Sequence, residues 1–217
     1  NMEVRVLLTN NFDENGSTLD FSNYITLVID VLRTTSTITT AFGKGAGKVI
    51  ISPTEEQAFK LKSLYPDYIL CGERKGIKIE GFDYDNSPLE LSKLNLKGRT
   101  IVLKTTNGVI SFIKAKDSKI VFALSVLNLQ YTIDQVISYS HKNKTDILFL
   151  CSGILGKVSY DDAFVAGFAI KYLSGKNIRI ELDDNAELVH NAFLNETDVY
   201  KALLKSSSAK RMTKLGL

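Results

Sequence analysis

One acidic and one basic residue follow a run of apolar residues near the start of the chain. In TLVIDVLRTTST, residues 26–37, Asp30 and Arg33 come after a strand-like segment, and a block of hydroxyl residues continues from them. A buried charge without a partner is costly, so two interpretations remain. Either Asp30 and Arg33 pair as a structural plug, or the strand end opens to a polar ligand. There a carboxylate could bind a divalent cation or attack phosphorus, and a guanidinium could clamp an anion.

Three further segments place polar and glycine residues directly after apolar runs. They are CGERKGIKIEGFDYDNSPLE (71–90), KTTNGV (104–109) and CSGILGKVSYDDAFVAG (151–167). Glu73 and Asp161 could act as acids or bases, Arg74 offers a second guanidinium, and Asp162 could ligate Mg²⁺. Taken singly, each segment could be an ordinary helix cap or turn. The coincidence of four such segments favours one shared cleft.

The elements that must position these segments alternate between strands and helices. Strand-like runs cover 2–9, 25–31, 47–52, 67–71, 99–105, 119–124 and 145–151. Helix-like runs cover 34–43, 54–65, 107–116, 128–141, 160–174, 184–193 and 196–205. This order predicts an α/β fold with a largely parallel or mixed sheet flanked by helices and an active site at the carboxyl ends of the strands. We expect a single domain over 1–217, with two α/β lobes of about 1–125 and 126–217 as a possible subdivision.

Composition excludes several classes of protein. The net charge is +3 without a concentrated basic face, which argues against nucleic acid as a partner. No apolar run approaches the roughly 20 residues that cross a bilayer, and the first residues show neither an apolar signal core nor a cleavage site, so we expect a cytoplasmic protein. Two cysteines and two histidines predict neither a disulfide framework nor a zinc site. The basic end SSSAKRMTKLGL, residues 206–217, is expected to be a solvated terminus.

Taken in order, the polar segments resemble the 2-phosphosulfolactate phosphatase family. The resemblance rests on VIDVLRTTSTI (28–38), the long 71–90 segment, KTTNGV, SVLN (125–128), and CSG followed by SYDDAFVAG (159–167). It covers roughly residues 25–170, and the combination of GER with GFDYDNSP makes it specific. One departure is Asp161, because the family usually has the longer glutamate at that position.

The resemblance implies a Mg²⁺-dependent phosphatase for the phosphate ester of a small anionic 2-hydroxy acid. The namesake reaction converts 2-phospho-3-sulfolactate and water to sulfolactate and phosphate, on the route to coenzyme M. Asp30, Glu73 and Asp161 would be catalytic, and Asp30 or Asp162 would bind the metal. The implied substrate-binding residues are Arg33, Thr34, Thr35, Arg74, Asn86, Ser87, Thr105, Thr106, Asn107, Gly108, Ser152 and Gly153.

Other readings of the same residues remain open at this point. Asp30 could be the nucleophile, a metal ligand or both, with Glu73 or Asp161 activating water. A haloacid-dehalogenase-type phosphatase also places Asp at a strand end, but it needs a second Asp two residues later, where this chain has Leu32. A non-catalytic sensor of a phosphorylated metabolite is the alternative from another class. The oligomeric state is open, with a homodimer as the usual state of an enzyme of this size.

Overall fold

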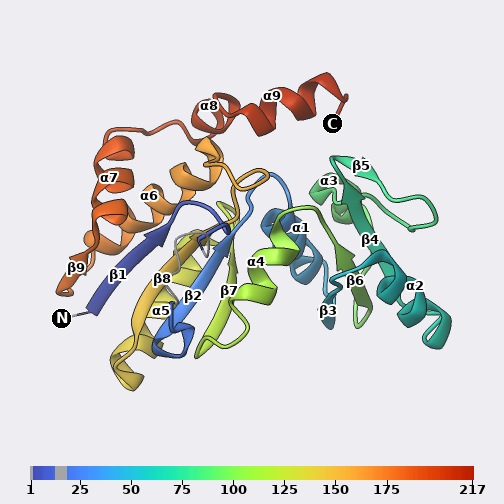
Figure 1. The fold of residues 1–217 in the computed structure, drawn as a ribbon, viewed down its shortest axis with the longest axis horizontal. Helices are drawn as coiled ribbons and strands as arrows, with labels where there is room; N and C mark the ends of the chain where they lie inside the picture. Colours follow the sequence, from blue (N-terminus) through green and yellow to red (C-terminus); the bar gives the residue numbers. More distant parts are fainter. Residues whose placement is uncertain (1, 13–18) are drawn as a thin grey trace.

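The fold consists of two α/β lobes, each built on its own sheet (Figure 1). The computed structural model describes residues 2–12 and 19–217. The first sheet has the order β7-β2-β8-β1-β9, and all its paired strands are parallel. Its strands are β1 (Met2–Leu7), β2 (Tyr24–Ile29), β7 (Ile120–Leu124), β8 (Asp146–Cys151) and β9 (Ile180–Leu182). We call the part of the molecule around this sheet the first lobe.

The second sheet is inserted between β2 and β7 in sequence. It has the order β3-β6-β4-β5, with β5 antiparallel to β4 and the other pairs parallel. Its strands are β3 (Lys48–Ile51), β4 (Ile69–Arg74), β5 (Ile77–Lys78) and β6 (Thr100–Lys104). This second lobe is therefore an insertion into the first, and the strands do not divide near residue 125.

Helices cover both sheets and cross the space between them (Figure 1). Their bounds are α1 (Thr34–Gly43), α2 (Glu55–Leu64), α3 (Pro88–Ser92), α4 (Gly108–Lys114), α5 (Leu129–Asn143), α6 (Tyr160–Ser174), α7 (Asp184–Phe193), α8 (Val199–Leu204) and α9 (Ser207–Lys214), with a short 3₁₀ turn at Phe21–Asn23. The predicted α/β class, with parallel and mixed sheets flanked by helices, is confirmed. No helix in the described ranges is long and apolar enough to span a bilayer.

Burial on both faces explains why several strands lack an alternating pattern. All six residues of β2 are buried, as expected for a central parallel strand. One face of the first sheet packs on α5, α6 and α7 through a core that includes Phe149 and Phe164. The opposite face contributes Val28 and Leu148 to a smaller core that includes Ala115, just after α4. Both cysteines are free and buried, in agreement with the prediction of no disulfide.

Most residues of the C-terminal segment 206–217 are exposed, as expected for a solvated end, but the segment also folds into a helix that was not predicted. This helix, α9, runs along the upper edge of the molecule from the first lobe toward β5 (Figure 1). Ser206 caps the helix by accepting a hydrogen bond from Ala209 N at 3.0 Å. At the far end, a Cβ on Gly76 would lie 3.4 Å from Leu215 Cδ1, so the two lobes meet under this helix.

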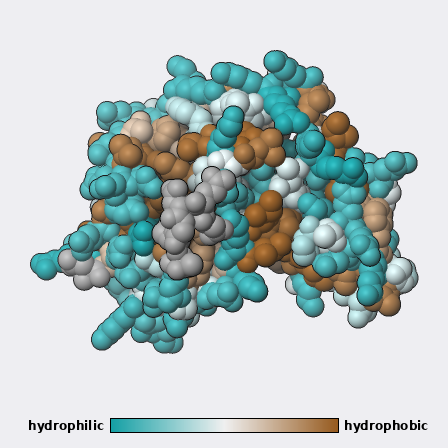
Figure 2. Space-filling model, viewed as in Figure 1, coloured by the Kyte–Doolittle hydropathy of each residue, from teal (hydrophilic) through white to brown (hydrophobic). Residues whose placement is uncertain are grey.

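Hydrophobic surface gathers between the lobes as well. Figure 2 shows a hydrophobic patch over α4, the helix that leads from the second sheet back to the first. Ile110 and Ile113 of α4 are both exposed. The same helix begins beside the end of β2, so the connection between the lobes also brings their polar strand ends together.

Candidate active site

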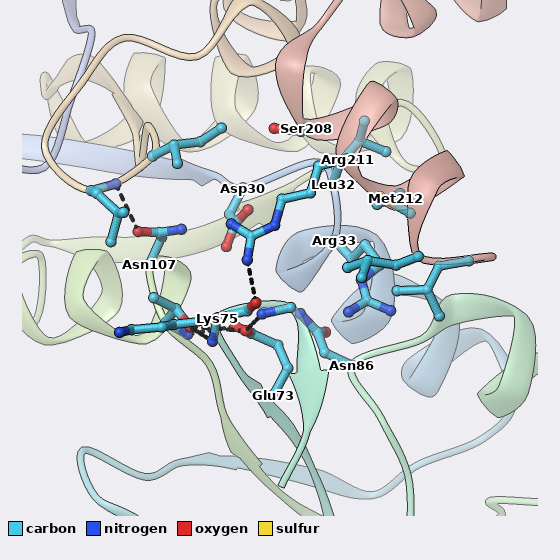
Figure 3. A pocket seen from close by; sticks show the side chains of 16 residues that line it. Asp30, Leu32, Arg33, Glu73, Lys75, Asn86, Asn107, Ser208, Arg211 and Met212 are labelled. Atoms are coloured by element: carbon cyan, nitrogen blue, oxygen red, sulfur yellow. Dashed lines mark hydrogen bonds between the residues drawn. The ribbon is translucent and has the colours of Figure 1, made fainter.

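A pocket lies where the carboxyl ends of β2, β4 and β6 meet α9 (Figure 3). It is open to solvent on one side and is lined by polar, charged and apolar side chains. Its lining residues are Asp30, Leu32, Arg33, Glu73, Lys75, Gly76, Asn86, Thr106, Asn107, Ile154, Leu155, Ser208, Arg211, Met212, Leu215 and Leu217. The expectation of a site at the strand ends therefore matches the position of the pocket, and both lobes contribute to it.

Asp30 is a buried carboxylate at the end of β2. The Thr34 hydroxyl donates a hydrogen bond to Asp30 Oδ2 at 2.6 Å, and the backbone N–H of Gly108 donates a second. Burial raises the pKa of Asp30 to about 7; the charges of Asp161 and Glu73 add to the rise, while the Thr34 bond opposes it. A carboxyl with this pKa can exchange its proton near neutral pH, which suits a catalytic group.

Thr34 connects Asp30 to the second lobe. Its Oγ1 lies 3.1 Å from Thr105 Oγ1 and accepts a hydrogen bond from Asn86 Nδ2 at 3.4 Å. Asn86 is 2 % exposed, and no described residue forms a hydrogen bond with its Oδ1. A buried acceptor without a donor is costly, and Asn86 lines the pocket. Its oxygen is therefore available for a bound ligand.

Arg33 does not pair with Asp30, which excludes the structural plug considered above. Its partner is Asp85, with an Nη1–Oδ2 distance of 2.8 Å. Both residues are buried, and Asp85 Oδ1 also accepts the backbone N–H of Asn86 at 2.7 Å. The pair fixes the start of α1 against the loop that carries Asn86. Arg33 still lines the pocket and presents positive charge there.

Glu73 holds two loops of the second lobe together. Its Oε1 accepts the backbone N–H of Thr106 at 2.6 Å, and its Oε2 accepts the backbone N–H of Gly76 at 2.6 Å and the Thr106 hydroxyl at 2.8 Å. Glu73 and Thr106 both line the pocket. Of the two residues predicted to activate water, Glu73 is the one that faces this space.

Asp161 and Asp162 lie behind the pocket at the start of α6. Asp162 accepts the backbone N–H of Val31 on Oδ1 and that of Gly153 on Oδ2, both at 3.0 Å. Asp161 accepts hydrogen bonds from the hydroxyls of Ser159 and Ser208. Burial raises the pKa of both carboxyls, and for Asp162 the charges of Asp161 and Asp30 add to the rise. Asp162 thus fixes the end of β2, and neither carboxylate lines the pocket.

Most of the remaining predicted residues stabilise the fold around the pocket, and one of them lies outside it. Thr35, Thr105 and Ser152 are fully buried and form hydrogen bonds within the fold, and Gly108 contacts Asp30 through its backbone. Ser87 caps α3. Arg74 is largely exposed and forms a two-fold ion pair with Glu55, with both N–O distances at 2.8 Å. It is absent from the pocket lining, so the structure does not bring Arg74 to the predicted cluster.

The sequence reasoning missed the contribution of α9. Ser208, Arg211, Met212 and Leu215 follow the i, i+3, i+4, i+7 spacing of one helix face, and all four line the pocket. Arg211 extends from α9 over the pocket and donates a hydrogen bond to the Lys75 carbonyl (Figure 3). That spacing was the available signal, but a face with few apolar residues does not stand out as a packing surface.

The described residues contain no group of three or more His, Cys, Asp or Glu side chains that could hold a metal ion. Mg²⁺ commonly needs only one or two carboxylates, since waters and substrate phosphates complete its octahedron. Asp30 offers a carboxylate and Asn86 an unpartnered amide oxygen in the same pocket, and Mg²⁺ can bind oxygen atoms of both types. The residues therefore fit Mg²⁺ held jointly with a phosphate ester.

Comparison with known proteins identifies the family of this chain. The family model described as 2-phosphosulpholactate phosphatase matches residues 12–217. A probable 2-phosphosulfolactate phosphatase of Clostridium acetobutylicum is 34% identical over 196 residues, which are 90% of this chain and 82% of the relative. Those of Thermotoga petrophila and Thermotoga maritima are each 40% identical, over 88% of this chain and 79% of the relative. The chain therefore belongs to the 2-phosphosulfolactate phosphatase family, whose members are hydrolases of phosphate monoesters.

Proposed function

We propose that this protein hydrolyses 2-phospho-3-sulfolactate to sulfolactate and phosphate in a Mg²⁺-dependent reaction, on the cytoplasmic route to coenzyme M. The observation that carries the proposal is that Asp30 and the unpartnered Asn86 Oδ1 line the same pocket. Relatives that share 34–40% of their residues with this chain are named for the same substrate. Homodimer formation stays a prediction from the sequence.

The charge of the pocket suits an ester of this type. The substrate carries a phosphate, a carboxylate and a sulfonate, so its binding needs several donors and cations. Arg33 and Arg211 supply guanidinium groups from two different elements of the pocket lining, one from the start of α1 and one from α9. Thr106 and Asn107 also line the pocket.

Asp30 and Asn86 are the residues that we expect to hold Mg²⁺. When bound, the ion would neutralise charge on the phosphoryl oxygens and favour the ionised form of Asp30. Burial, and then the charges of Asp161 and Glu73, raise the pKa of Asp30 and so act against its ionisation, which supports a role for a bound cation. Without a compensating positive charge, an ionised Asp30 would also repel the phosphate.

Asp30 is our candidate nucleophile. Its carboxylate oxygen would form a bond to phosphorus while the ester oxygen leaves and takes up a proton, giving an aspartyl-phosphate. Water would then attack that phosphorus, releasing phosphate and restoring Asp30. Glu73 lines the same pocket and is the residue that we expect to accept the proton of this water. Thr34 orients Asp30 throughout by its 2.6 Å hydrogen bond.

The test is phosphate release from 2-phosphosulfolactate by the wild type and by Asp30→Asn, with Mg²⁺ and with excess EDTA. We expect turnover that needs the metal and falls at least about a thousandfold in the variant, as for loss of a nucleophile. Full activity in EDTA would refute the Mg²⁺ dependence. Saturable binding without any turnover would show that the protein is a sensor of this metabolite.

A further inference from the structure

The positive charge that α9 brings to the pocket is that of Arg211, for which the described part of the chain provides no acidic partner. Arg211 donates a hydrogen bond to the Lys75 carbonyl, and residues 2–12 and 19–217 provide no ion pair for it. A carbonyl oxygen carries only a partial charge, so the guanidinium keeps its charge and its other N–H donors. Arg211 is therefore free to bind an anion in the pocket that it lines.

The other two arginines near the strand ends each already have a carboxylate partner. Arg33 lies 2.8 Å from Asp85 in a buried pair, and Arg74 donates from Nε and Nη2 to Glu55. A substrate with two acid groups besides its phosphate needs a further cation. Among these three arginines, Arg211 alone both lines the pocket and lacks a carboxylate partner in the described ranges.

The backbone of α9 is held in place on both sides of the pocket. On the first lobe, the Ser208 hydroxyl donates to Asp161 Oδ1 at 3.3 Å and lies 3.4 Å from Ser159 Oγ. On the second lobe, Leu215 reaches Gly76, next to the carbonyl that Arg211 binds. Arg211 is thus presented from a helix anchored at two points, which gives its side chain a defined place over the pocket (Figure 3).

We infer that Arg211 binds the acid group of the substrate that is remote from the phosphate, its carboxylate or its sulfonate, and thereby selects acidic esters over plain ones. The inference rests on the proposed function for the identity of the ester. It adds a specificity residue from the C-terminal helix, outside the strand-end segments 28–38, 71–90, 104–109 and 151–167. Arg211 forms and breaks no bond in the reaction; its contribution is to binding.

The test compares Arg211→Gln and Arg211→Lys with the wild type on three esters. 2-Phosphosulfolactate has both acid groups, 2-phospholactate keeps the carboxylate, and isopropyl phosphate has neither. We expect Arg211→Gln to raise KM for 2-phosphosulfolactate about 10- to 100-fold, the usual effect of losing a charged hydrogen bond, with kcat changed little. The change in kcat/KM for isopropyl phosphate should stay within about twofold, and Arg211→Lys should recover part of the loss.

The matched control is Lys210→Gln, which removes the same charge from the same helix at an exposed position outside the pocket lining. It should leave all three esters unaffected. A loss shared by 2-phospholactate would assign Arg211 to the carboxylate, and a loss confined to 2-phosphosulfolactate would assign it to the sulfonate. An equal loss on isopropyl phosphate, or no loss on any ester, would overturn the inference.

Calorimetric binding of 2-phosphosulfolactate separates this inference from the proposed function. If the wild type binds the ester without hydrolysing it and Arg211→Gln weakens that binding, the role of Arg211 stands and the phosphatase proposal fails. If the enzyme is active but Arg211→Gln binds the ester as tightly as the wild type, the role of Arg211 is refuted alone. If the wild type neither binds nor hydrolyses the ester, both are refuted.

Discussion

Gly108 approaches Asp30 so closely that the backbone leaves no room for a side chain. A Cβ on Gly108 would lie 2.6 Å from Asp30 Oδ2 and 2.7 Å from both Cβ and Cγ2 of Thr34. The N–H of Gly108 donates to Asp30, so this contact also orients the carboxylate. Because Gly108 begins α4, directly after the second sheet, the close approach couples the position of Asp30 to the placement of the inserted lobe.

We therefore expect Gly108→Ala to lower kcat/KM for phosphate release by at least about tenfold and to destabilise the fold by about 1–3 kcal/mol, the usual cost of overpacking. Either Asp30 or α4 must move to admit the methyl group. Activity and urea unfolding measure the two effects. Gly43→Ala is the matched control, since a Cβ on Gly43 meets nothing within 4 Å. Wild-type activity in Gly108→Ala would contradict the contact.

The raised pKa of Asp30 predicts a pH dependence of stability. The folded-state pKa is about 7 and the unfolded value about 3.8, so between these values the folded protein holds a proton that the unfolded chain releases. The free energy of unfolding of the metal-free protein should therefore fall as pH rises from about 4 to about 7. Asp161 and Asp162, with pKa values raised by burial, add to the same trend.

Urea unfolding in EDTA at pH 5 and pH 8 measures this effect. Asp30→Asn should reduce the loss of stability between the two pH values, because it removes one of the groups that must ionise in the folded state. Asp134→Asn is the control: hydrogen bonds from Lys176 and Tyr172 lower the pKa of that exposed carboxyl, which is ionised at both pH values. A wild type that gains stability from pH 5 to pH 8 would show that Asp30 is not protonated in the folded protein.

Both cysteines should be unreactive in the folded protein. Cys71 and Cys151 are fully buried, and burial raises the pKa of each thiol, which suppresses the reactive thiolate. A disulfide reagent at pH 8 should label neither cysteine in the native state and both in denaturant. Rapid labelling of one cysteine without denaturant would mean that its strand end opens to solvent.

The sequence predicts the elements well wherever local signals suffice. Helix α1 is found at its predicted bounds, and α2 lies within its predicted range 54–65, where Gln57 N donates a 3.1 Å hydrogen bond to the capping Thr54 Oγ1. The strand order could not be predicted in the same way. Strands β2 and β7 are neighbours in the first sheet although the whole second sheet lies between them in sequence. Hydrophobic periodicity does not report contacts between segments so distant in sequence. The short strand β9 was missed for the same reason, because it pairs with the distant β1. Strand β5 pairs with its neighbour β4 and was missed because it has only two residues.

The candidate site divides in a similar way. Asp30 and Glu73 were identified from polar residues at strand ends, a position that topology makes a meeting point, and Asn86 was implied by the family resemblance. The ionic partners were not identified, because residue type does not say which way a side chain points. Asp85 was passed over although it binds Arg33, and Arg211 was placed in a solvated end. Both depend on how the second lobe and α9 fold over the strand ends.

Arg33 and Arg74 were both predicted from the sequence to bind substrate, yet they differ strongly in burial and in the ion pairs that they form. Arg33 is buried against Asp85, while Arg74 is exposed and paired with Glu55. Removing one member of a buried pair leaves an uncompensated charge, which costs about 3–5 kcal/mol, whereas an exposed pair contributes about 0–1 kcal/mol. Arg33→Met should therefore lower stability severely and abolish activity, and Arg74→Met should change neither by much.

Urea unfolding and phosphate release on the two variants check this contrast, and a double variant identifies its cause. Arg33→Met combined with Asp85→Leu removes both charges, so it should recover a large part of the stability that Arg33→Met loses, yet remain inactive. Recovery of activity as well would mean that Arg33 only neutralises Asp85. A strong loss of activity in Arg74→Met at unchanged stability would return Arg74 to the substrate site that the sequence first assigned to it.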